Sequence, residues 1–357
     1  EQVGILWKEL FSNYGIKIHF AHQTFNWSNE AKSNAAVHVV IIGFAQFDST
    51  NKRIFEYENI KSNAHEKSAK NINAYLVEGD DIVIEKRRKP LCNVLNIIKG
   101  NYYAKSEGLI IEEKDLDYLV KNEPNAKKWI KLLIGADEFI NNRKRYCLWL
   151  VDCPPDELRK MPLVMERVNR VREDRLKSTD KGMQNLAPIR FRETNNPDKC
   201  IVIPVVSSEK RPYIPIGFID KNTISTNGNL IIPNGDLFLF GQLTSLMHMA
   251  WVKYTCGRLK SDYRYSKDLV YNNYPFPKNV SEKQKKAVEE KAQNVLNIRS
   301  QFSDCSLADL YDPLSMPPNL KKAHQELDKA VDNCYGSKSF KNDKERIEFL
   351  FGLYEEY

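Results

Sequence analysis

The chain begins with a helix-period pattern that changes into a strand-period pattern. Apolar residues recur at helical spacing over 4–12, and Gly15 ends this predicted helix. Residues 16–21 are predicted to form a strand, and the nearly unbroken run rich in Val and Ile over 36–44 predicts a second strand that is buried on both faces. Such strands are typical of the interior of an α/β sheet.

A third strand is predicted after a polar turn. Residues 48–52 are polar, whereas residues 53–57 alternate between apolar and polar side chains. We therefore expect the strands over 36–44 and 53–57 to pair as a hairpin.

The middle of the chain, from residue 82 to 277, has short apolar segments separated by irregular polar ones. Strands are predicted over 109–111, 147–151, 200–206 and 213–219, and helices over 115–133, 155–177 and 237–255. This mixture predicts a mixed α+β domain.

After residue 277 the composition shifts to helix-forming residues, which marks a domain boundary. Ser281 and Gln284 have the spacing of a capping box at the start of a helix. Apolar stripes at helical spacing predict two further helices, from 317 and from 343. We expect the three helices to form a bundle that braces the preceding domain.

These patterns predict a multidomain protein that combines α/β and α+β parts. A chain of 357 residues is long enough for two or three domains with sizeable cores. The predicted domains cover residues 1–65, 66–277 and 278–357.

The composition excludes some classes of protein. Hydrophobic residues make up 42% of the chain and charged residues 28%, as in ordinary globular proteins, so extensive disorder is not expected. No apolar run approaches the ~20 residues that a bilayer-spanning helix needs, so no membrane partner is expected. The net charge of +7 permits a polyanionic partner without requiring one.

The cysteines indicate the redox environment of the protein and not a metal or disulfide site. They are scattered at positions 92, 147, 153, 200, 256, 305 and 334, without a CxxC pair. An odd, scattered set is typical of free thiols in a reducing environment, not of a disulfide framework or a zinc site. The cysteines therefore predict a cytoplasmic protein without a bound metal.

Aromatic and hydrogen-bonding side chains alternate between the first two predicted strands. The aromatic residues are Phe20, Phe25 and Trp27, and the polar residues among them are His22, Gln23, Thr24, Asn26 and Asn29. Stacking surfaces beside hydrogen-bonding groups suit the binding of a flat heterocycle. Ordinary core packing of the three aromatic residues is the alternative interpretation.

The segment GRLKSDYRYS, residues 257–266, is the densest group of basic and hydroxylic side chains, and we predict that it is a DNA-binding loop. Guanidinium groups can engage guanine O6 and N7 in pairs, so Arg258 and Arg264 are predicted to read bases, whereas Lys260 mainly follows phosphate charge. Alternatively, Asp262 forms a structural ion pair with one of the arginines. The candidate DNA contacts are Arg258, Lys260, Ser261, Arg264 and Tyr265.

A second candidate surface is the segment SSEKRP, residues 207–212, between two predicted strands. Its hydroxyl and basic side chains could meet phosphates or base edges. A plain surface turn explains the same residues equally well. The candidate contacts here are Ser207, Ser208, Lys210 and Arg211.

Several long segments of unusual composition run from one end of the chain to the other. They are EQVGILW, IHFAHQTFNW, AAVHVVIIGF, RKPLCNV, FINNRKRYCLWL, SSEKRPYIPIGF, MHMAWVKYTCGRLKSDYRYS, VYNNYPFP and SLADLYDPLSMPP. In these segments the chain resembles the MmeI-like, type IIL family of restriction-modification enzymes, which methylate DNA adenine at N6.

The resemblance implies a role for each predicted domain. Residues 1–65 would be the C-terminal edge of a Rossmann-like methyltransferase sheet, residues 66–277 a mixed α+β target-recognition domain, and residues 278–357 a C-terminal helical bundle. The expected partner is double-stranded DNA. Phe25, or Trp27 as the second choice, would stack on the adenine that is flipped out of the duplex.

The resemblance also implies what the chain lacks. In the family, a glycine-rich loop holds S-adenosylmethionine and an Asn-Pro-Pro-aromatic loop holds the adenine amine. Here no GxGxxG follows a predicted strand, and the nearest matches to the second loop, residues 195–198 and 273–276, each contain a single proline. We therefore expect a fragment of a longer methyltransferase that contains no catalytic residue and binds no cofactor alone. A stand-alone DNA-binding specificity subunit without enzymatic activity is the alternative.

Overall fold

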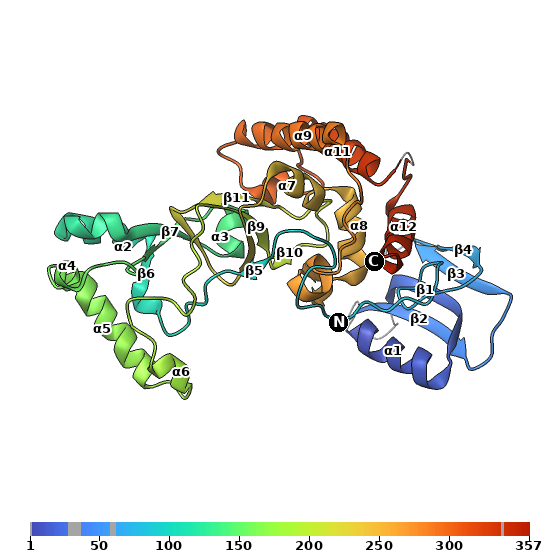
Figure 1. The fold of residues 1–357 in the computed structure, drawn as a ribbon, viewed down its shortest axis with the longest axis horizontal. Coiled ribbons are helices and arrows are strands. Elements are labelled where there is room, and N and C mark those ends of the chain that lie inside the picture. The colour runs from blue at the N-terminus through green and yellow to red at the C-terminus, as the bar shows by residue number, and fades with distance from the viewer. Residues whose placement is uncertain (1, 28–36, 58–61, 337–338) are drawn as a thin grey trace, which may run out of the picture.

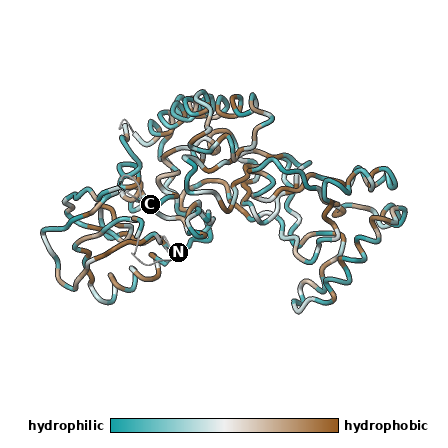
Figure 2. The backbone as a smooth tube through the Cα atoms, turned by 180° about the vertical axis from the view of Figure 1, so that it is seen from behind, coloured by the Kyte–Doolittle hydropathy of each residue, from teal (hydrophilic) through white to brown (hydrophobic). Residues whose placement is uncertain are grey.

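The computed structural model describes residues 2–27, 37–57, 62–336 and 339–357. Of the residues named or quoted above in sequence letters, Glu1, Asn29, Ala35 and Ala36 lie outside these ranges. Figure 1 shows an elongated molecule with an N-terminal sheet at one end, a lobe of mixed strands and helices at the other, and a central body between them. In Figure 2 the hydrophobic stretches lie mainly in the N-terminal sheet and the central body, whereas the long helices above the body are largely hydrophilic.

The N-terminal unit consists of α1 (Gln2–Tyr14), β1 (Lys17–Trp27), β2 (Val37–Ala45), β3 (Lys52–Tyr57) and β4 (Ala64–Ala69). The four strands form one sheet in the order β2-β1-β3-β4. The predicted helix ends as expected, because Gly15 has a φ of 60°, a left-handed conformation that glycine adopts without strain. The strands predicted over 16–21 and 36–44 are confirmed as β1 and β2, although β1 is longer than predicted.

The predicted hairpin between the second and third strands is wrong. β2 pairs antiparallel with β1, and β3 pairs in parallel with the opposite edge of β1, where Ile54 lies beside Ala21. The alternation over 53–57 identifies a strand, but it does not specify which neighbour that strand takes. The connection after β2 therefore crosses β1 instead of turning back on β2.

The prediction that β2 is buried on both faces is also wrong. Val40 is 46% exposed and Phe44 is 49% exposed, because β2 is the edge strand of the sheet and has a single strand neighbour. Helix α1 covers part of one face, where the rings of Trp7 and Phe44 have centroids 5.9 Å apart. The apolar run thus predicts the strand correctly, but it does not predict that the strand is partly exposed to solvent.

The distal lobe is built on a four-stranded sheet and carries most of the short helices. Its elements are β6 (Ile110–Glu112), α2 (Glu113–Asn122), β7 (Ile130–Ile134), β8 (Arg145–Leu148), α4 (Pro155–Leu158), α5 (Pro162–Leu176), α6 (Lys181–Gln184) and β12 (Thr223–Ser225). The strand order is β12-β7-β8-β6. β7 pairs in parallel with β12 and antiparallel with β8.

Two predicted helices of this lobe are interrupted by prolines. The helix predicted over 115–133 stops before Pro124, and its last residues belong to β7 instead. The helix predicted over 155–177 is divided before Pro162. Proline disfavours the helical conformation of the residue before it, and Glu123 and Met161 both have non-helical backbone angles.

The central body has a third four-stranded sheet, in the order β11-β9-β13-β5. Its elements are β5 (Ile98–Lys99), α3 (Ala136–Asn141), β9 (Lys199–Pro204), β11 (Gly217–Asp220), β13 (Asn229–Pro233), α7 (Leu237–Leu243) and α8 (Leu246–Thr255). The helix predicted over 237–255 is therefore two helices, because the Ser245 side chain accepts the backbone N–H of His248 and begins α8. α8 belongs to the core of the central body, since Trp251 is fully buried.

The predicted C-terminal helices are confirmed as α9 (Glu282–Ser300), α11 (Pro318–Cys334) and α12 (Asp343–Glu355), with a short α10 (Leu307–Leu310) between the first two. The predicted capping box at Ser281 and Gln284 is present. In Figure 1, α9 and α11 lie above the central body, and α12 lies between α8 and the N-terminal sheet. An ion pair between Lys344 and Glu56 connects α12 to β3.

Two C-terminal helices hold the segment that follows residues 207–212. The ring of Tyr213 stacks on His324 of α11 with centroids 4.0 Å apart, and its hydroxyl donates to Asp328 Oδ2 at 2.6 Å. Arg299 of α9 donates from Nη1 to the carbonyl oxygen of Ile216 at 2.7 Å. These contacts hold the residues directly after the 207–212 segment against the C-terminal helices.

Buried His324 makes the stability of the protein depend on pH. The side chain packs against Tyr213 and Tyr311, and burial lowers its pKa to about 3. An unfolded histidine titrates near pH ~6.5, so the stabilising contribution of neutral His324 is complete above that pH and is lost as the pH falls below it. Relative to His324→Gln, the wild type should lose about 1.4 kcal/mol of unfolding free energy between about pH 7.5 and about pH 5.5.

Urea unfolding at the two pH values measures this difference. The matched control is His65→Gln, because His65 is exposed on β4. If the His324→Gln variant kept the full pH dependence of the wild type, the buried neutral imidazole would not be its source.

Within the described residues, no helix has the length and apolar content needed to cross a membrane.

Candidate nucleic-acid interface

The candidate stacking residues Phe25 and Trp27 lie on β1 and not in a loop, because β1 stays paired with β2 as far as Trp27. Phe25 is half-buried, whereas Trp27 is 49% exposed. Their ring centroids are 6.2 Å apart, with the planes tilted by 55°. Both side chains are therefore positioned by the sheet itself.

Three further rings form an aromatic cluster with Phe25 and Trp27. Phe25 stacks on Tyr57 at a centroid distance of 5.1 Å. His22 stacks on Phe55 at 4.2 Å with nearly parallel planes, and its Nδ1 lies 2.8 Å from the Tyr57 hydroxyl. We call these five residues the aromatic cluster.

The parallel pairing of β1 with β3 creates the aromatic cluster, because it places His22 opposite Phe55. Sequence reasoning missed Phe55 and Tyr57 as site residues, since it paired their strand with β2. The available signal was the alternation of aromatic residues along 53–57. Tyr57 already covers one face of the Phe25 ring, so a flat ligand can stack only on the other face or on Trp27.

The two basic segments, far apart in the sequence, come together in a small sheet. Its strands are β10 (Val206–Ser207), β14 (Gly257–Leu259) and β15 (Asp262–Arg264), in the order β10-β15-β14. Val206 pairs with Arg264, and Ser207 pairs with Tyr263. The sequence predicted the two segments separately and did not predict this pairing.

The predicted DNA-binding loop is a β-hairpin. Its two strands are joined at Lys260 and Ser261, and Lys260 has a left-handed φ of 57°. A left-handed residue at this position lets a tight turn match the twist of the two strands. Lys260 is exposed at the tip, whereas Ser261 is half-buried.

The two arginines of the hairpin lie on opposite faces of the small sheet. Arg258 is paired with Tyr263, whereas Arg264 is paired with Gly257. Directly paired residues share a face and successive residues alternate, so Arg264 belongs to the face away from Tyr263. Arg264 is exposed, and its side chain has no hydrogen bond or ion pair with another residue of the described ranges.

Two predicted contacts do not fit the structure, because their side chains are buried. Tyr265 is 2% exposed, and its hydroxyl lies 2.9 Å from Nε2 of buried His248. Ser207 is also 2% exposed, and its hydroxyl accepts a hydrogen bond from Arg211 Nη1 at 3.4 Å. Neither hydroxyl can meet DNA without breaking up the core of the small sheet.

The remaining residues of the 207–212 segment are more accessible. Lys210 is exposed, and Ser208 and Arg211 are half-buried. The alternative, an ion pair of Asp262 with a hairpin arginine, is not found within the described residues, where Glu209 lies 3.6 Å from Arg258 instead.

A cleft of about 870 Å³ lies between the N-terminal sheet, where Tyr57 lines it, and the hairpin, where Arg258 and Tyr263 line it. Trp7 and Leu10 of α1 form part of its apolar wall. Its polar and aromatic lining comes from the N-terminal sheet on one side and from α8 and the hairpin on the other, namely Gln23, Thr24, Tyr57, Lys253, Arg258 and Tyr263. Tyr57 of the aromatic cluster and Arg258 and Tyr263 of the hairpin therefore line the same cavity.

One of the two near matches to an Asn-Pro-Pro-aromatic loop, residues 273–276, has a structural role. Asn273 is fully buried, and its amide nitrogen donates to the carbonyl oxygens of Glu85 and Asp268, both at 2.9 Å. An amide committed to backbone partners in this way is not available to an adenine amine.

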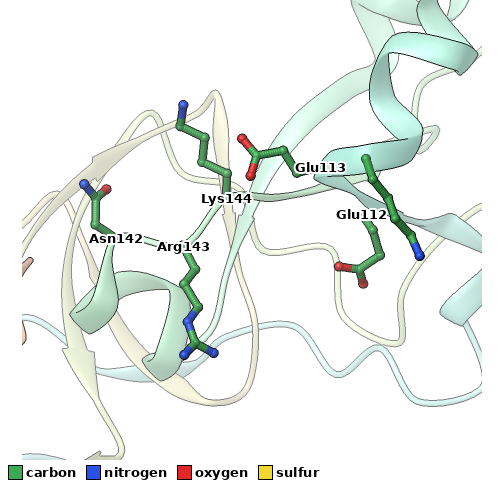
Figure 3. A pocket seen from close by; sticks show the side chains of 6 residues that line it. Glu112, Glu113, Asn142, Arg143 and Lys144 are labelled. Atoms are coloured by element: carbon green, nitrogen blue, oxygen red, sulfur yellow. The ribbon is translucent and has the colours of Figure 1, made fainter.

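A separate hollow in the distal lobe has no convergent set of ligands. Acidic and basic side chains alternate around it and point in different directions, as Figure 3 shows. Its lining residues are Glu112, Glu113, Lys114, Asn142, Arg143 and Lys144. Nowhere in the described ranges do three His, Cys, Asp or Glu side chains form a group that could hold a metal ion.

Comparison with known proteins covers nearly the whole chain. Residues 1–56 match the domain described as "MmeI, DNA-methyltransferase domain", residues 78–278 match "MmeI, target recognition domain", and residues 280–357 match "MmeI, C-terminal domain".

Two individual proteins are similar along the full length of the chain. One is "DNA methyltransferase A" of Bacillus subtilis (strain 168), 41% identical over 360 aligned residues. The other is the type IIL restriction-modification enzyme MmeI, whose structure was solved in complex with DNA, at 46% identity and a TM-score of 0.87. The chain spans 40% of the length of the first relative and 48% of the second. The target-recognition match alone covers more than half of the residues, and the chain belongs to the MmeI family.

Proposed function

We propose that this chain is the DNA-recognising C-terminal portion of a site-specific DNA adenine-N6 methyltransferase from a restriction-modification system. The observation that carries the proposal is the pairing of β10 with β15, which joins two basic segments in one surface. Arg258 and Tyr263 of that region share the cleft with Tyr57 of the aromatic cluster. The names of the two relatives, a DNA methyltransferase and a restriction-modification enzyme solved with DNA, support the same function.

The aromatic cluster would receive the target base. A methyl group cannot be transferred to an exocyclic amine inside a duplex, so the adenine must be flipped out, and an aromatic ring can replace part of its lost stacking. Phe25 is the first candidate because its ring is held in place by Tyr57. Trp27 is the second candidate because it is the more exposed ring.

The small sheet would read the DNA sequence. Arg264 is the proposed base-reading residue, because its guanidinium group is exposed and uncommitted within the described structure. Lys260 at the hairpin tip and Lys210 in the neighbouring segment would contact the phosphates, since an ammonium group interacts with DNA mainly through its positive charge. Ser208 and Ser261 are half-buried at the edges of the same surface and would make secondary contacts.

S-adenosylmethionine would serve the full-length enzyme and would not be held by this chain alone. We expect calorimetric titration of the 357-residue chain with S-adenosylmethionine to give no binding heat, because the glycine-rich loop that holds the cofactor in the family does not occur in its sequence. A full-length enzyme of this family is the positive control. A clear one-to-one titration with the chain alone would overturn the assignment of these residues to the recognition part.

Sequencing of methylated bases in genomic DNA tests the proposed activity. A strain with the full gene should carry N6-methyladenine at one short sequence that is unmethylated in a strain without the gene. The alternative is a specificity subunit that has no enzymatic activity and works with a catalytic subunit encoded by another gene. In that case, methylation also disappears when the other gene is removed. The seven cysteines form no disulfide with one another, which is compatible with work in the reducing cytoplasm, the location we expect.

A further inference from the structure

We propose that Arg258 is a positioning residue that fixes the β14–β15 hairpin and the 207–212 segment in one arrangement for DNA recognition. This inference rests on the proposed function. It changes the role predicted from the sequence, in which Arg258 reads bases together with Arg264.

The terminal nitrogens of Arg258 are directed at the protein. Nη1 donates to the carbonyl oxygen of Ser261 at 2.9 Å, and Nη2 donates to the carbonyl oxygen of Lys253 at 3.4 Å. Nη1 also lies 3.6 Å from Glu209 Oε2. The guanidinium carbon is 4.2 Å from the centroid of the Tyr263 ring, a favourable cation–π distance.

These contacts join three separate pieces of the chain. Ser261 is in the hairpin turn, Lys253 is in the last turn of α8, and Glu209 is in the 207–212 segment. A second connection runs in parallel, because Asp262 Oδ1 accepts the backbone N–H of Glu209 at 3.3 Å. The planar, multidentate guanidinium group suits such a junction better than an ammonium group would.

The sheet geometry separates Arg258 from the proposed reading surface. Arg258 shares a face with Tyr263, which is 4% exposed, whereas Arg264 lies on the opposite face. A duplex on the Arg264 face does not meet the Arg258 guanidinium directly, because Arg258 lines the cleft on the Tyr263 side of the sheet. To reach a base, Arg258 would have to leave Glu209 without its ion pair and release the turn.

The test uses the 357-residue chain and a pool of duplexes with a randomised central region. Sequencing before and after capture gives the base preference at each position, and fluorescence anisotropy gives the affinity for the most enriched duplex across a salt series. Arg258→Gln should weaken that affinity by about tenfold, the combined effect of a cation–π contact and a hydrogen bond. It should lower the preference at several positions together and leave the salt slope unchanged, because no phosphate contact is lost.

Glu209→Gln is the discriminating variant, since the two roles predict effects of opposite sign. If Arg258 is a positioning residue, Glu209→Gln weakens specific binding although it removes a negative charge, and the double variant is no weaker than Arg258→Gln alone. If Arg258 contacts DNA, Glu209→Gln frees its guanidinium group and strengthens binding.

Arg264→Gln is the matched control on the other face of the sheet. It should lower the base preference at only one position of the recognised sequence. A thermal unfolding scan of each variant shows whether the fold is retained. If Arg258→Gln unfolds, Glu209→Gln alone still distinguishes the two roles, because they predict effects of opposite sign for this half-buried partner. A salt slope reduced by about one in Arg258→Gln, or additive effects of the two substitutions, would overturn the positioning role. If the wild-type chain enriches no sequence at all, the proposed function itself fails.

Discussion

Replacing Arg264 with alanine should weaken binding to the preferred duplex by about 5- to 150-fold, which corresponds to the ~1 to 3 kcal/mol of a good arginine contact with a base. The same change should relax one position of the recognised sequence. The physical reason is that Arg264 is exposed, lies on the face away from Tyr263 and is not tied to another side chain of the described structure. Fluorescence anisotropy on the preferred duplex and on singly altered duplexes measures both effects.

Lys260→Ala is the control for this prediction, because Lys260 lies at the tip of the same hairpin. It should weaken binding to every sequence and lower the salt slope by about one, the signature of one lost phosphate contact. If both substitutions weakened preferred and altered duplexes equally, the hairpin would be a backbone clamp. Base reading would then have to come from the 207–212 segment.

Phe25→Ala in the full-length enzyme should reduce the rate of methylation by roughly 5- to 150-fold, since stacking of one base on one aromatic ring contributes ~1 to 3 kcal/mol. The choice of site should not change, because stacking holds the flipped base and does not read its neighbours. The Phe25 ring stacks on Tyr57, so one of its faces is fixed and the other is left for the base. Single-turnover methylation of the recognised duplex is the measurement.

Trp27→Ala is the matched variant, two positions along the same strand. If it slows methylation and Phe25→Ala does not, the stacking role belongs to Trp27. Wild-type rates in both variants would show that the aromatic cluster is ordinary packing and not a base pocket.

Local patterns were sufficient for the elements that depend on near neighbours. The helix that ends at Gly15, the capping box at Ser281 and the strand around Val40 all follow from side chains within a few positions of each other. The basic and aromatic candidate segments were found in the same way. The domain boundaries at 65 and 277 stay predictions.

Pairing between distant strands could not be predicted from the sequence. Nothing local to residues 53–57 shows that they join β1 instead of β2, and the aromatic cluster depends on that choice. The pairing of Val206 with Arg264 is equally non-local. Register also decides exposure, which is why Tyr265 is buried against His248 while adjacent Arg264 is exposed.

The central claim, that this chain chooses a DNA sequence, is tested most directly by capture from the randomised duplex pool. The purified 357-residue chain is mixed with the pool, bound duplexes are recovered at near-physiological salt, and both populations are sequenced. We predict that one short sequence containing adenine is strongly enriched, and that the enrichment is lost at one position in Arg264→Ala. Recovery of all sequences in their starting proportions would contradict the claim.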